Sequence, residues 1–362
     1  MSLKVQEFLR NGGTLEKLDS IYAISAKRHL IYPNLVLLKY NQIDSNFNDL
    51  LVRQCRGLIL DEKDDWNVVS YSFDKFANYG EGYADEIDWG VAEVLEKADG
   101  SLTVLYNYDN KWHVQTSGMP DASGSLGNST SKSFADVFWL TWNKMGLQLP
   151  TDTTKCWIFE MMLPPEMHRI VVKHDQPKLA LIGVRDRITF EEHKPCQFAG
   201  QYPTVKSFPL QSMQDVINTF SSMNPLAQEG YVILGGKNGG SFKRVKVKHP
   251  GYVNIHHMKN ETGPKSMVEI VRSGEVPEVI AHFPEFKEEF DKISIAYNKL
   301  VGQITADYDR LKDIPIQKDF ALEAVKTTCS GALFSIRGKK TKNIKQYLAE
   351  MNIDNLIKLL GI

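Results

Sequence analysis

Short apolar runs rich in β-branched and aromatic residues recur along the chain from about residue 34 to residue 247. Such runs, bounded by polar and glycine-containing segments, are typical of β-strands. The pattern predicts strands at 34–40, 55–60, 67–73, 92–96, 101–108, 112–116, 156–163, 170–173, 179–185, 230–235 and 242–247. We expect these strands to form a multi-stranded, mainly antiparallel assembly.

Helical periodicity interrupts the strands at 133–145, where Phe134, Val137, Phe138 and Trp142 share one face, and at 211–223. The apolar stripes of both helices should cover the outer faces of the sheets. One or two short helices, broken at Gly12-Gly13, are expected within residues 1–20. The segment 117–133 is rich in Ser, Gly, Asn and Asp, which predicts a mobile surface loop.

Helical patterns take over beyond residue 250, at 264–273, 284–313, 316–328 and 341–362. The whole pattern predicts an α+β protein with an antiparallel-sheet domain over residues 1–260 and an all-helical C-terminal domain over residues 261–362. A length of 362 residues suits two domains.

Composition narrows the class of protein. The 43 Lys and Arg residues nearly balance the 44 Asp and Glu residues, so a polyanion would need a local concentration of positive charge. Cys55, Cys156, Cys196 and Cys329 are scattered without a C-x-x-C pair, which argues against a zinc site or a disulfide framework. No signal peptide and no apolar run long enough to cross a bilayer is present, so we expect a cytoplasmic protein without a membrane partner.

Lys97 is the first candidate for chemistry. The sequence Lys97-Ala98-Asp99-Gly100 lies between two predicted strands, so it should form a tight turn that holds the lysine at a strand end. Asp-Gly is also a common hairpin dipeptide with solvated neighbours. The motif alone therefore does not establish a site.

Other charged residues interrupt or end predicted strands. Glu160 and Glu229 lie beside apolar runs, where a carboxylate is costly to bury unless it meets a cation, a metal ion or a sugar hydroxyl. Lys246 and Lys248 are two residues apart and so project from one face, where they repel each other unless an anion lies between them. The two lysines could also be ordinary solvated charges of an edge strand.

Arg56 and Lys75 lie at the ends of predicted strands, where either could bind a phosphate. In chain order, the motif residues resemble those of ATP-dependent RNA ligases within the covalent nucleotidyltransferases, and most closely the bacteriophage RNA ligase 1 family. They are Arg56-Gly57, Lys75, Lys97-Ala98-Asp99-Gly100, Glu160, Glu229-Gly230-Tyr231 and Lys246-Val247-Lys248.

The resemblance covers about residues 35–255, with a weaker likeness in the helical tail. The Arg-Gly pair upstream of the lysine motif and Tyr252 after Lys248 favour this branch, because DNA ligases carry their Arg-Gly after the lysine motif.

The resemblance implies an ATP-grasp-like adenylyltransferase domain in which Lys97 is the nucleophile that takes AMP from ATP. Lys246 and Lys248 would stabilise the triphosphate, and Tyr252 would serve the RNA steps. Nearby cations and a bound metal ion should favour the neutral amine of Lys97, and burial should add to that effect. Glu160 and Glu229 would contact Mg²⁺ or Mn²⁺, directly or through water, or else the ribose. The residues implied to line the ATP and phosphate site are Tyr40, Arg56, Lys75, Lys97, Glu160, Glu229, Lys246 and Lys248.

The implied activity is RNA repair, in which AMP passes to an RNA 5′-phosphate and an RNA 3′-hydroxyl then displaces it. A broken tRNA is one candidate substrate, and an end-healing kinase or phosphatase would prepare the ends. The helical tail would dock RNA, with the basic segment 337–345 either gripping the backbone or forming a solvated loop. The oligomeric state stays open.

Three positions depart from the family pattern. Ala77 replaces an aromatic residue, so a stacking contact would come from Phe76, Tyr79 or elsewhere; the segment 115–118 lacks a lysine that binds phosphate; and Ala98 replaces an acidic residue. The alternative functions are a nick-sealing DNA ligase, a capping guanylyltransferase and a catalytically silent RNA-binding protein of the same fold. The helical tail argues against the first two, which append a β-rich domain to this core.

Overall fold

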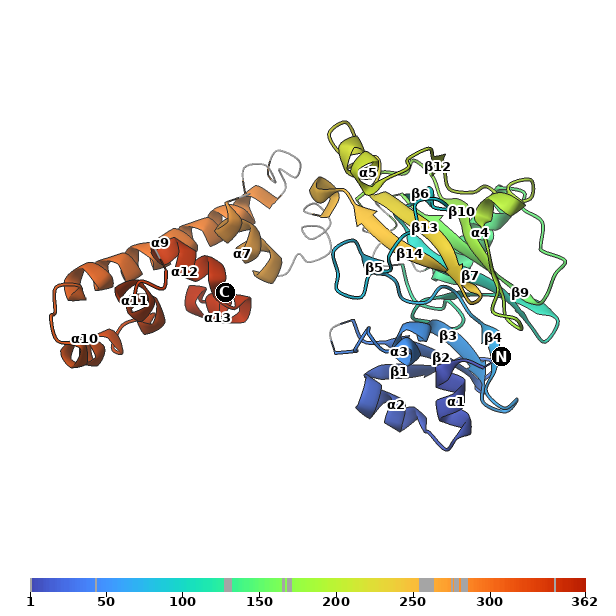
Figure 1. The fold of residues 1–362 in the computed structure, drawn as a ribbon, viewed down its shortest axis with the longest axis horizontal. Helices are drawn as coiled ribbons and strands as arrows, with labels where there is room; N and C mark the ends of the chain where they lie inside the picture. The colour runs from blue at the N-terminus through green and yellow to red at the C-terminus, as the bar shows by residue number, and fades with distance from the viewer. Residues whose placement is uncertain are drawn as a thin grey trace. The chain divides into compact units, whose positions relative to one another are not determined.

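The chain forms two compact units, Met1–Val253 and Asn254–Ile362 (Figure 1). The computed structural model describes residues 2–42, 44–126, 132–164, 167, 171–253, 264–274, 276, 280, 286–341 and 343–362. The domain boundary predicted near residue 260 and part of the loop predicted over residues 117–133 lie outside these residues.

The strands of the first unit form three sheets (Figure 1). The four-stranded sheet has the order β1 (Ile24–Arg28), β2 (Leu35–Tyr40), β3 (Arg56–Asp61) and β4 (Asn67–Ser70). The second, called the β9 sheet, has the order β11 (Glu192–His193), β10 (Lys178–Asp186), β9 (Lys155–Met162), β7 (Ser101–Tyr108) and β8 (Lys111–Thr116). The third, called the β13 sheet, has the order β12 (Ser207–Phe208), β6 (Glu93–Lys97), β13 (Gly230–Asn238), β14 (Ser241–Lys248) and β5 (Ala77–Asn78).

Neighbouring strands are antiparallel except β14 and β5, so the expected mainly antiparallel α+β architecture is confirmed. The helices of this unit are α1 (Lys4–Arg10), α2 (Leu15–Tyr22), α3 (Leu50–Gln54), α4 (Phe134–Lys144), α5 (Met213–Thr219) and the 3₁₀ helix Pro195–Phe198. Helix α4 begins with a reciprocal capping pair, in which the Ser133 side chain accepts from the Asp136 backbone and the Asp136 carboxylate accepts from the Ser133 backbone.

The β9 sheet is buried on both faces. Ile158 on one face packs with Leu37 of the four-stranded sheet, and Phe159 on the other face packs with Phe138 and Trp142 of α4. The β13 sheet carries α5 on one face through Val216. Both predicted helices therefore cover sheet faces, as their apolar stripes indicate.

The β13 sheet also contacts the β9 sheet, through Leu95 and Leu234 against Ala180. Ala180 lies opposite Glu160 in the register of β10 and β9. Glu160 alternates with the buried Phe159 and so projects toward the junction of the two sheets.

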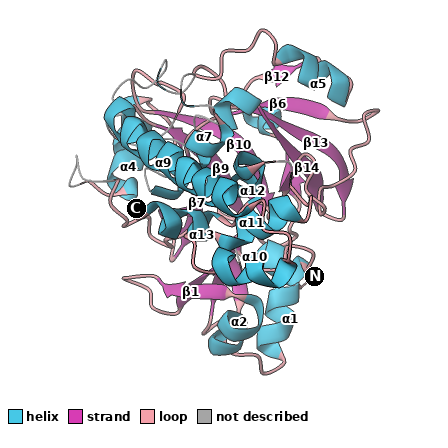
Figure 2. Cartoon of the chain, turned by 90° about the vertical axis from the view of Figure 1, so that its left-hand side faces the viewer, coloured by secondary structure: helices cyan, strands magenta, loops and turns pink. Residues whose placement is uncertain are grey.

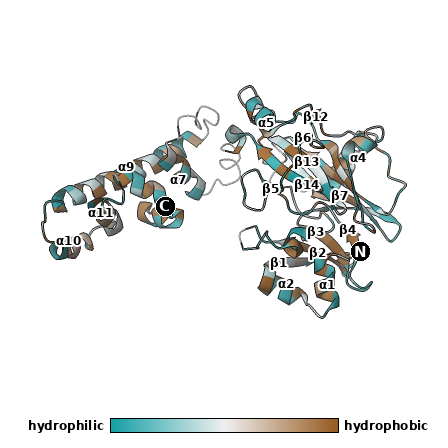
Figure 3. Cartoon of the chain, in the orientation of Figure 1, coloured by the Kyte–Doolittle hydropathy of each residue, from teal (hydrophilic) through white to brown (hydrophobic). Residues whose placement is uncertain are grey.

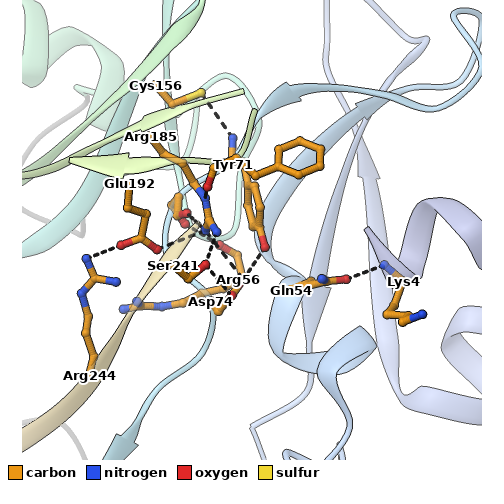
Figure 4. Close-up of polar contacts among 12 residues, drawn as sticks. Lys4, Gln54, Arg56, Tyr71, Asp74, Cys156, Arg185, Glu192, Ser241 and Arg244 are labelled. Atoms are coloured by element: carbon orange, nitrogen blue, oxygen red, sulfur yellow. Dashed lines mark hydrogen bonds and ion pairs between the residues drawn. The ribbon is translucent and has the colours of Figure 1, made fainter. Parts of the chain in front are cut away.

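A buried charge network ties this junction together (Figure 4). Glu192 of β11 pairs with Arg244 of β14 at 2.5 Å and with Arg185 of β10 at 3.4 Å. The Arg185 guanidinium also donates to the Ser72 carbonyl at 2.7 Å and lies 3.6 Å from the centroid of the Tyr71 ring. Since Glu192 and Arg185 are almost fully buried, each charge depends on its partners for compensation.

In the second unit the described residues form helices α7 (Pro264–Ser273), α9 (Lys287–Leu311), α10 (Gln317–Ala324), α11 (Ser330–Arg337), α12 (Ile344–Glu350) and α13 (Ile353–Leu360) (Figure 2). Helix α9 mixes hydrophobic and hydrophilic residues along its length (Figure 3). Its buried residues follow helical spacing and include Phe290, Ile293, Tyr297, Leu300 and Ile304.

Two sequence predictions are wrong in detail. Residues 171–173 form no strand, because the backbone amides of Val171 and Val172 donate to the Asp99 carboxylate. The segment 341–362 contains two helices, and Asn352 caps the second by accepting from the Asp354 amide. None of the helices within the described residues is long and apolar enough to span a membrane.

We expect Glu192→Ala to lower the free energy of unfolding of the first unit by about 3–5 kcal/mol, because Arg185 and Arg244 would lose a buried partner. Glu191→Ala is the matched control, since this neighbouring carboxylate pairs with Lys237 at the surface and should change stability by about 0–1 kcal/mol. Urea unfolding followed by tryptophan fluorescence measures this unit, which contains all six tryptophans. Equal losses in both variants would contradict the assigned role of the network.

Candidate active site

Lys97 is the last residue of β6, and the turn after it enters β7 of a different sheet. The predicted tight turn is therefore a crossing between two sheets and not a hairpin. Asp99 fixes the crossing, because its buried carboxylate accepts hydrogen bonds from the amides of Val171 and Val172 at 2.9 and 2.8 Å. The turn holds Lys97 at the junction of the two sheets.

Close packing brings the turn to β9. A side chain at Gly100 would place its Cβ 2.4 Å from the Met161 carbonyl oxygen, so this position requires glycine. Glu160 precedes Met161 and lies opposite Leu102 in the register of β9 and β7. Glu160 and Lys97 consequently face the same space.

Glu229 bridges two lysines from β6 and β14, the strands on either side of β13. Its carboxylate lies 2.6 Å from the Lys97 Nζ and 3.2 Å from the Lys248 Nζ. The arrangement follows from register, because Gly230 lies opposite Lys97 on one side and Lys248 on the other. Gly230 has a φ of +147°, and a Cβ there would lie 2.2 Å from the Val247 carbonyl oxygen.

A cavity of about 80 Å³, called the inner cavity, lies beside these residues. Its apolar walls come from both contacting sheets and from Phe76. The Arg56 guanidinium and the Lys246 ammonium lie over the Phe76 ring at 5.0 and 5.4 Å. The side chains that line the inner cavity are Arg56, Phe73, Phe76, Leu95, Glu96, Lys97, Ala98, Leu102, Glu160, Ile182, Val205, Val232, Leu234, Arg244 and Lys246.

The other predicted site residues, Tyr40, Lys75 and Tyr252, are not among the residues that line the inner cavity but lie near Arg56 or Lys248. Lys75 is buried, donates to Gln42 at 3.3 Å and lies over the rings of Tyr40 and Phe47 at 5.3 and 4.9 Å. Tyr252 is buried, and its ring centroid lies 5.7 Å from the Lys248 Nζ. The structure thus gathers every predicted site residue in the first unit, while their roles in binding stay predictions.

Positive charge dominates one side of the site. Burial, together with Lys75 and Arg56, lowers the pKa of Lys246 to about 7. Burial and Arg56 likewise lower the pKa of Lys75. Cations with lowered pKa values are stabilised when an anion binds among them, so this side suits a phosphate.

The carboxylates dominate the other side. Burial alone would lower the pKa of Lys97, but Glu229 and Glu160 outweigh burial and raise it. The neutral amine expected from the sequence is therefore not favoured by the protein groups alone, because the carboxylates around Lys97 outweigh its burial. Burial raises the pKa of Glu160 to about 8.

Glu160 and Glu229 fit a hard divalent cation. Mg²⁺ commonly uses one or two carboxylates and completes its shell with waters and substrate phosphates. Among the described residues no group of three or more His, Cys, Asp or Glu side chains is arranged to hold a metal ion. The donor set therefore suits a metal that is shared with a phosphate ligand.

Sequence reasoning overlooked two contributors. Asp99 was interpreted only as half of a turn dipeptide, and its anchoring of residues 171–172 depends on a long-range contact. Phe47 lies in a polar segment without periodicity, and no sequence signal marks its contact with Lys75. Ala77 cannot supply the stacking contact of the family's aromatic residue. Of the two alternatives named from the sequence, Phe76 lines the inner cavity, whereas Tyr79 is exposed.

We expect the raised pKa of Glu160 to make the parent protein less stable as pH rises. The folded chain holds this proton more tightly than the unfolded chain, whose Glu160 has a pKa of 4.5. The stabilisation is therefore complete below pH 4.5 and is lost as the pH rises past about 8. Glu160→Gln removes the titration. The unfolding midpoint of the parent relative to this variant should fall between about pH 5 and pH 9. The exposed carboxylate variant Glu86→Gln serves as the control, and a constant difference would contradict the prediction.

Comparison with known proteins places this site in context. A family model described as RNA ligase matches residues 54–252. An RNA ligase of Rhodothermus phage RM378 is 26% identical over 339 residues, which covers 77% of this chain and 76% of the relative. A protein of Autographa californica nuclear polyhedrosis virus, provisionally named a bifunctional polynucleotide kinase/RNA ligase, is 26% identical over 321 residues. That match covers 84% of this chain and 45% of the viral protein.

Among solved structures, an archaeal ATP-dependent RNA ligase is similar with a TM-score of 0.49 and 12% identity, covering 84% of this chain and 83% of that one. The family match includes Arg56, Lys97, Glu229 and Lys246 and extends over more than half of the chain. Because of that coverage, this chain belongs to the RNA ligase family.

Proposed function

We propose that this chain is an ATP-dependent RNA ligase that joins RNA 5′-phosphate and 3′-hydroxyl ends through lysyl-AMP and RNA-adenylate intermediates. The observation that carries the proposal is the meeting of Lys97, Glu229 and Lys248 within ion-pair distance beside a cavity lined by Arg56 and Lys246. The first unit would be an ATP-grasp-like adenylyltransferase domain.

In the first step the Lys97 Nζ attacks the α-phosphorus of ATP. The new N–P bond forms as the P–O bond to pyrophosphate breaks, which leaves AMP on the lysine and releases pyrophosphate. Phe76 and the apolar walls of the inner cavity would contact the adenine, and Arg56 and Lys246 would stabilise the triphosphate charge.

Lys97 must lose a proton before it attacks, and Glu229 opposes that loss. A bound Mg²⁺ or Mn²⁺ would neutralise Glu229 and Glu160 and polarise the phosphates. Lys248 already shares the Glu229 carboxylate and so weakens its hold on Lys97. Whether Glu160 and Glu229 contact the metal or the ribose is open in this proposal.

In the later steps AMP moves to an RNA 5′-phosphate, and an RNA 3′-hydroxyl then displaces it. Tyr252 would act in these steps from its position beside Lys248. A kinase or phosphatase would have to prepare such ends, and the viral relative is named for a kinase as well as a ligase. A broken tRNA in the cytoplasm is a candidate substrate.

The helical unit would dock RNA through exposed Lys339, Lys340 and Lys345. Arg337 is less suited to this role, because its guanidinium donates to the Ile314 carbonyl at 2.7 Å and lies over Phe320. Lys342, in the same basic segment, lies outside the described residues.

We expect the parent protein to acquire label from α-labelled ATP with Mg²⁺ or Mn²⁺, and Lys97→Met to acquire none, because the variant lacks the nucleophilic amine. The matched control Lys111→Met removes an exposed lysine on β8 and should label like the parent. Labelling by GTP in preference to ATP would indicate a capping-type guanylyltransferase. RNA binding without any covalent label would indicate a silent RNA-binding protein.

We further expect the parent to circularise a 5′-phosphorylated single-stranded RNA with ATP and metal, while Lys97→Met fails. The variant should still seal an RNA that already carries 5′-AMP, because that step breaks a bond to AMP without forming lysyl-AMP. Gel separation of linear, adenylylated and circular RNA measures each step. Preferential sealing of nicked duplex DNA would contradict the proposed substrate class.

A further inference from the structure

A second cavity, called the outer cavity, has a volume of about 790 Å³ and lies in the first unit. Arg56 lines it and also lines the inner cavity, so the two cavities share this side chain as a wall. The residues that line the outer cavity are Asp19, Ala23, Ser25, Lys39, Tyr40, Asn41, Gln42, Asp44, Arg56 and Ser117.

Lys39 supplies a cation to the wall of the outer cavity. It is half-buried near the end of β2, and within the part of the chain that the structure describes its ammonium group has no hydrogen bond or ion pair. Burial, Lys27 and Arg56 all lower its pKa. The Arg56 Nη1 is likewise buried and has no hydrogen-bond partner among the residues that the structure describes. Such groups are costly unless an anion binds them.

The loop after β8 is shaped to accommodate Lys39. The Lys39 Nζ lies 3.2 Å from the position that a Cβ of residue 118 would occupy, so Gly118 leaves room for the ammonium. The strand β2 thus delivers the amine of Lys39 to this loop.

The positive charge continues outward from Lys39. Lys27, which is exposed, lies close enough to lower the pKa of Lys39, and its Nζ is 3.4 Å from the Sδ of Met119, the residue after Gly118. The row Arg56, Lys39, Lys27 thus runs from the inner cavity to the surface. The two carboxylates in the outer cavity, Asp19 and Asp44, are on exposed residues, whereas Lys39 and Arg56 are half-buried.

We propose that the outer cavity binds the RNA strand whose 5′-phosphate receives AMP, with Lys39 as a phosphate-binding residue beside Arg56. This rests on the proposed ligase function. Proteins that bind single-stranded nucleic acid use a positively charged groove that follows the backbone, and the row Arg56, Lys39, Lys27 provides such a path. The outer cavity is also far larger than the inner cavity, at about 790 against about 80 Å³.

Lys39→Met tests this inference in two measurements. In the first, lysyl-AMP is formed from labelled ATP, and we expect a rate close to that of the parent. In the second, the preformed lysyl-AMP protein receives limiting 5′-phosphorylated RNA at several salt concentrations. We expect AMP transfer to fall about ten-fold or more, because a charged hydrogen bond to phosphate is lost. The slope of the logarithm of the rate against the logarithm of salt should decrease by about 0.7.

Two further variants guard against misfolding and general charge effects. Lys39→Arg keeps the charge and should retain most of the transfer rate. Lys63→Met removes an exposed lysine that follows β3, at the opposite end of the strand from Arg56. This variant should leave the transfer rate and the salt slope unchanged. Urea unfolding by tryptophan fluorescence checks that each variant is folded.

Parallel losses of lysyl-AMP formation and RNA transfer in Lys39→Met would assign Lys39 to the triphosphate and overturn the inference. Unchanged RNA transfer would overturn it as well. If the parent forms no lysyl-AMP, the proposed function fails, and fluorescence anisotropy of a labelled 5′-phosphorylated RNA then tests the outer cavity by itself. Weaker binding with a smaller salt slope in Lys39→Met supports the inference, and equal binding refutes it.

Discussion

The ion bridge from Glu229 to Lys97 and Lys248 is the interaction on which the site depends. Three adjacent strands of one sheet deliver these side chains, and Gly230 allows the strands to approach closely enough for one carboxylate to reach both amines. Because register fixes the pairing, a slip of one residue in β13 would turn Glu229 away from Lys97. Lys97, the proposed nucleophile, is thus positioned by the sheet itself.

The bridge also leaves the site electrostatically divided. Carboxylates raise the pKa of Lys97, while burial and neighbouring cations lower that of Lys246 to about 7. In the proposed function, a divalent cation held by Glu229 and Glu160 and a polyphosphate held by Lys246 and Arg56 would relieve both conditions together. Activation of Lys97 would then depend on binding of a metal–nucleotide complex.

Rigid packing around the sheet junction supports this balance. Glu192 ties β11 to β14 through Arg244 (Figure 4). Asp99 ties the turn after Lys97 to residues 171–172. These buried charged contacts have directional partners, so they restrict how the two sheets can shift. Arg56 links the inner and outer cavities, which would allow one guanidinium to serve both a nucleotide and an RNA strand in turn.

The sequence by itself determined most strands, the helices that cover them and the single-face placement of Lys246 and Lys248, because these follow from side-chain periodicity. It also indicated the chemical character of Lys97, Glu160 and Glu229 from charges set in apolar runs. Only the tertiary structure decided that the turn after Lys97 joins two sheets, that Asp99 anchors it and that Lys39 reaches the Gly118 loop. The raised pKa of Lys97 was also decided only by the tertiary structure, because it depends on Glu229, which lies far along the chain. Periodicity records the local face of each residue, whereas strand partners and burial of charge depend on contacts between distant residues.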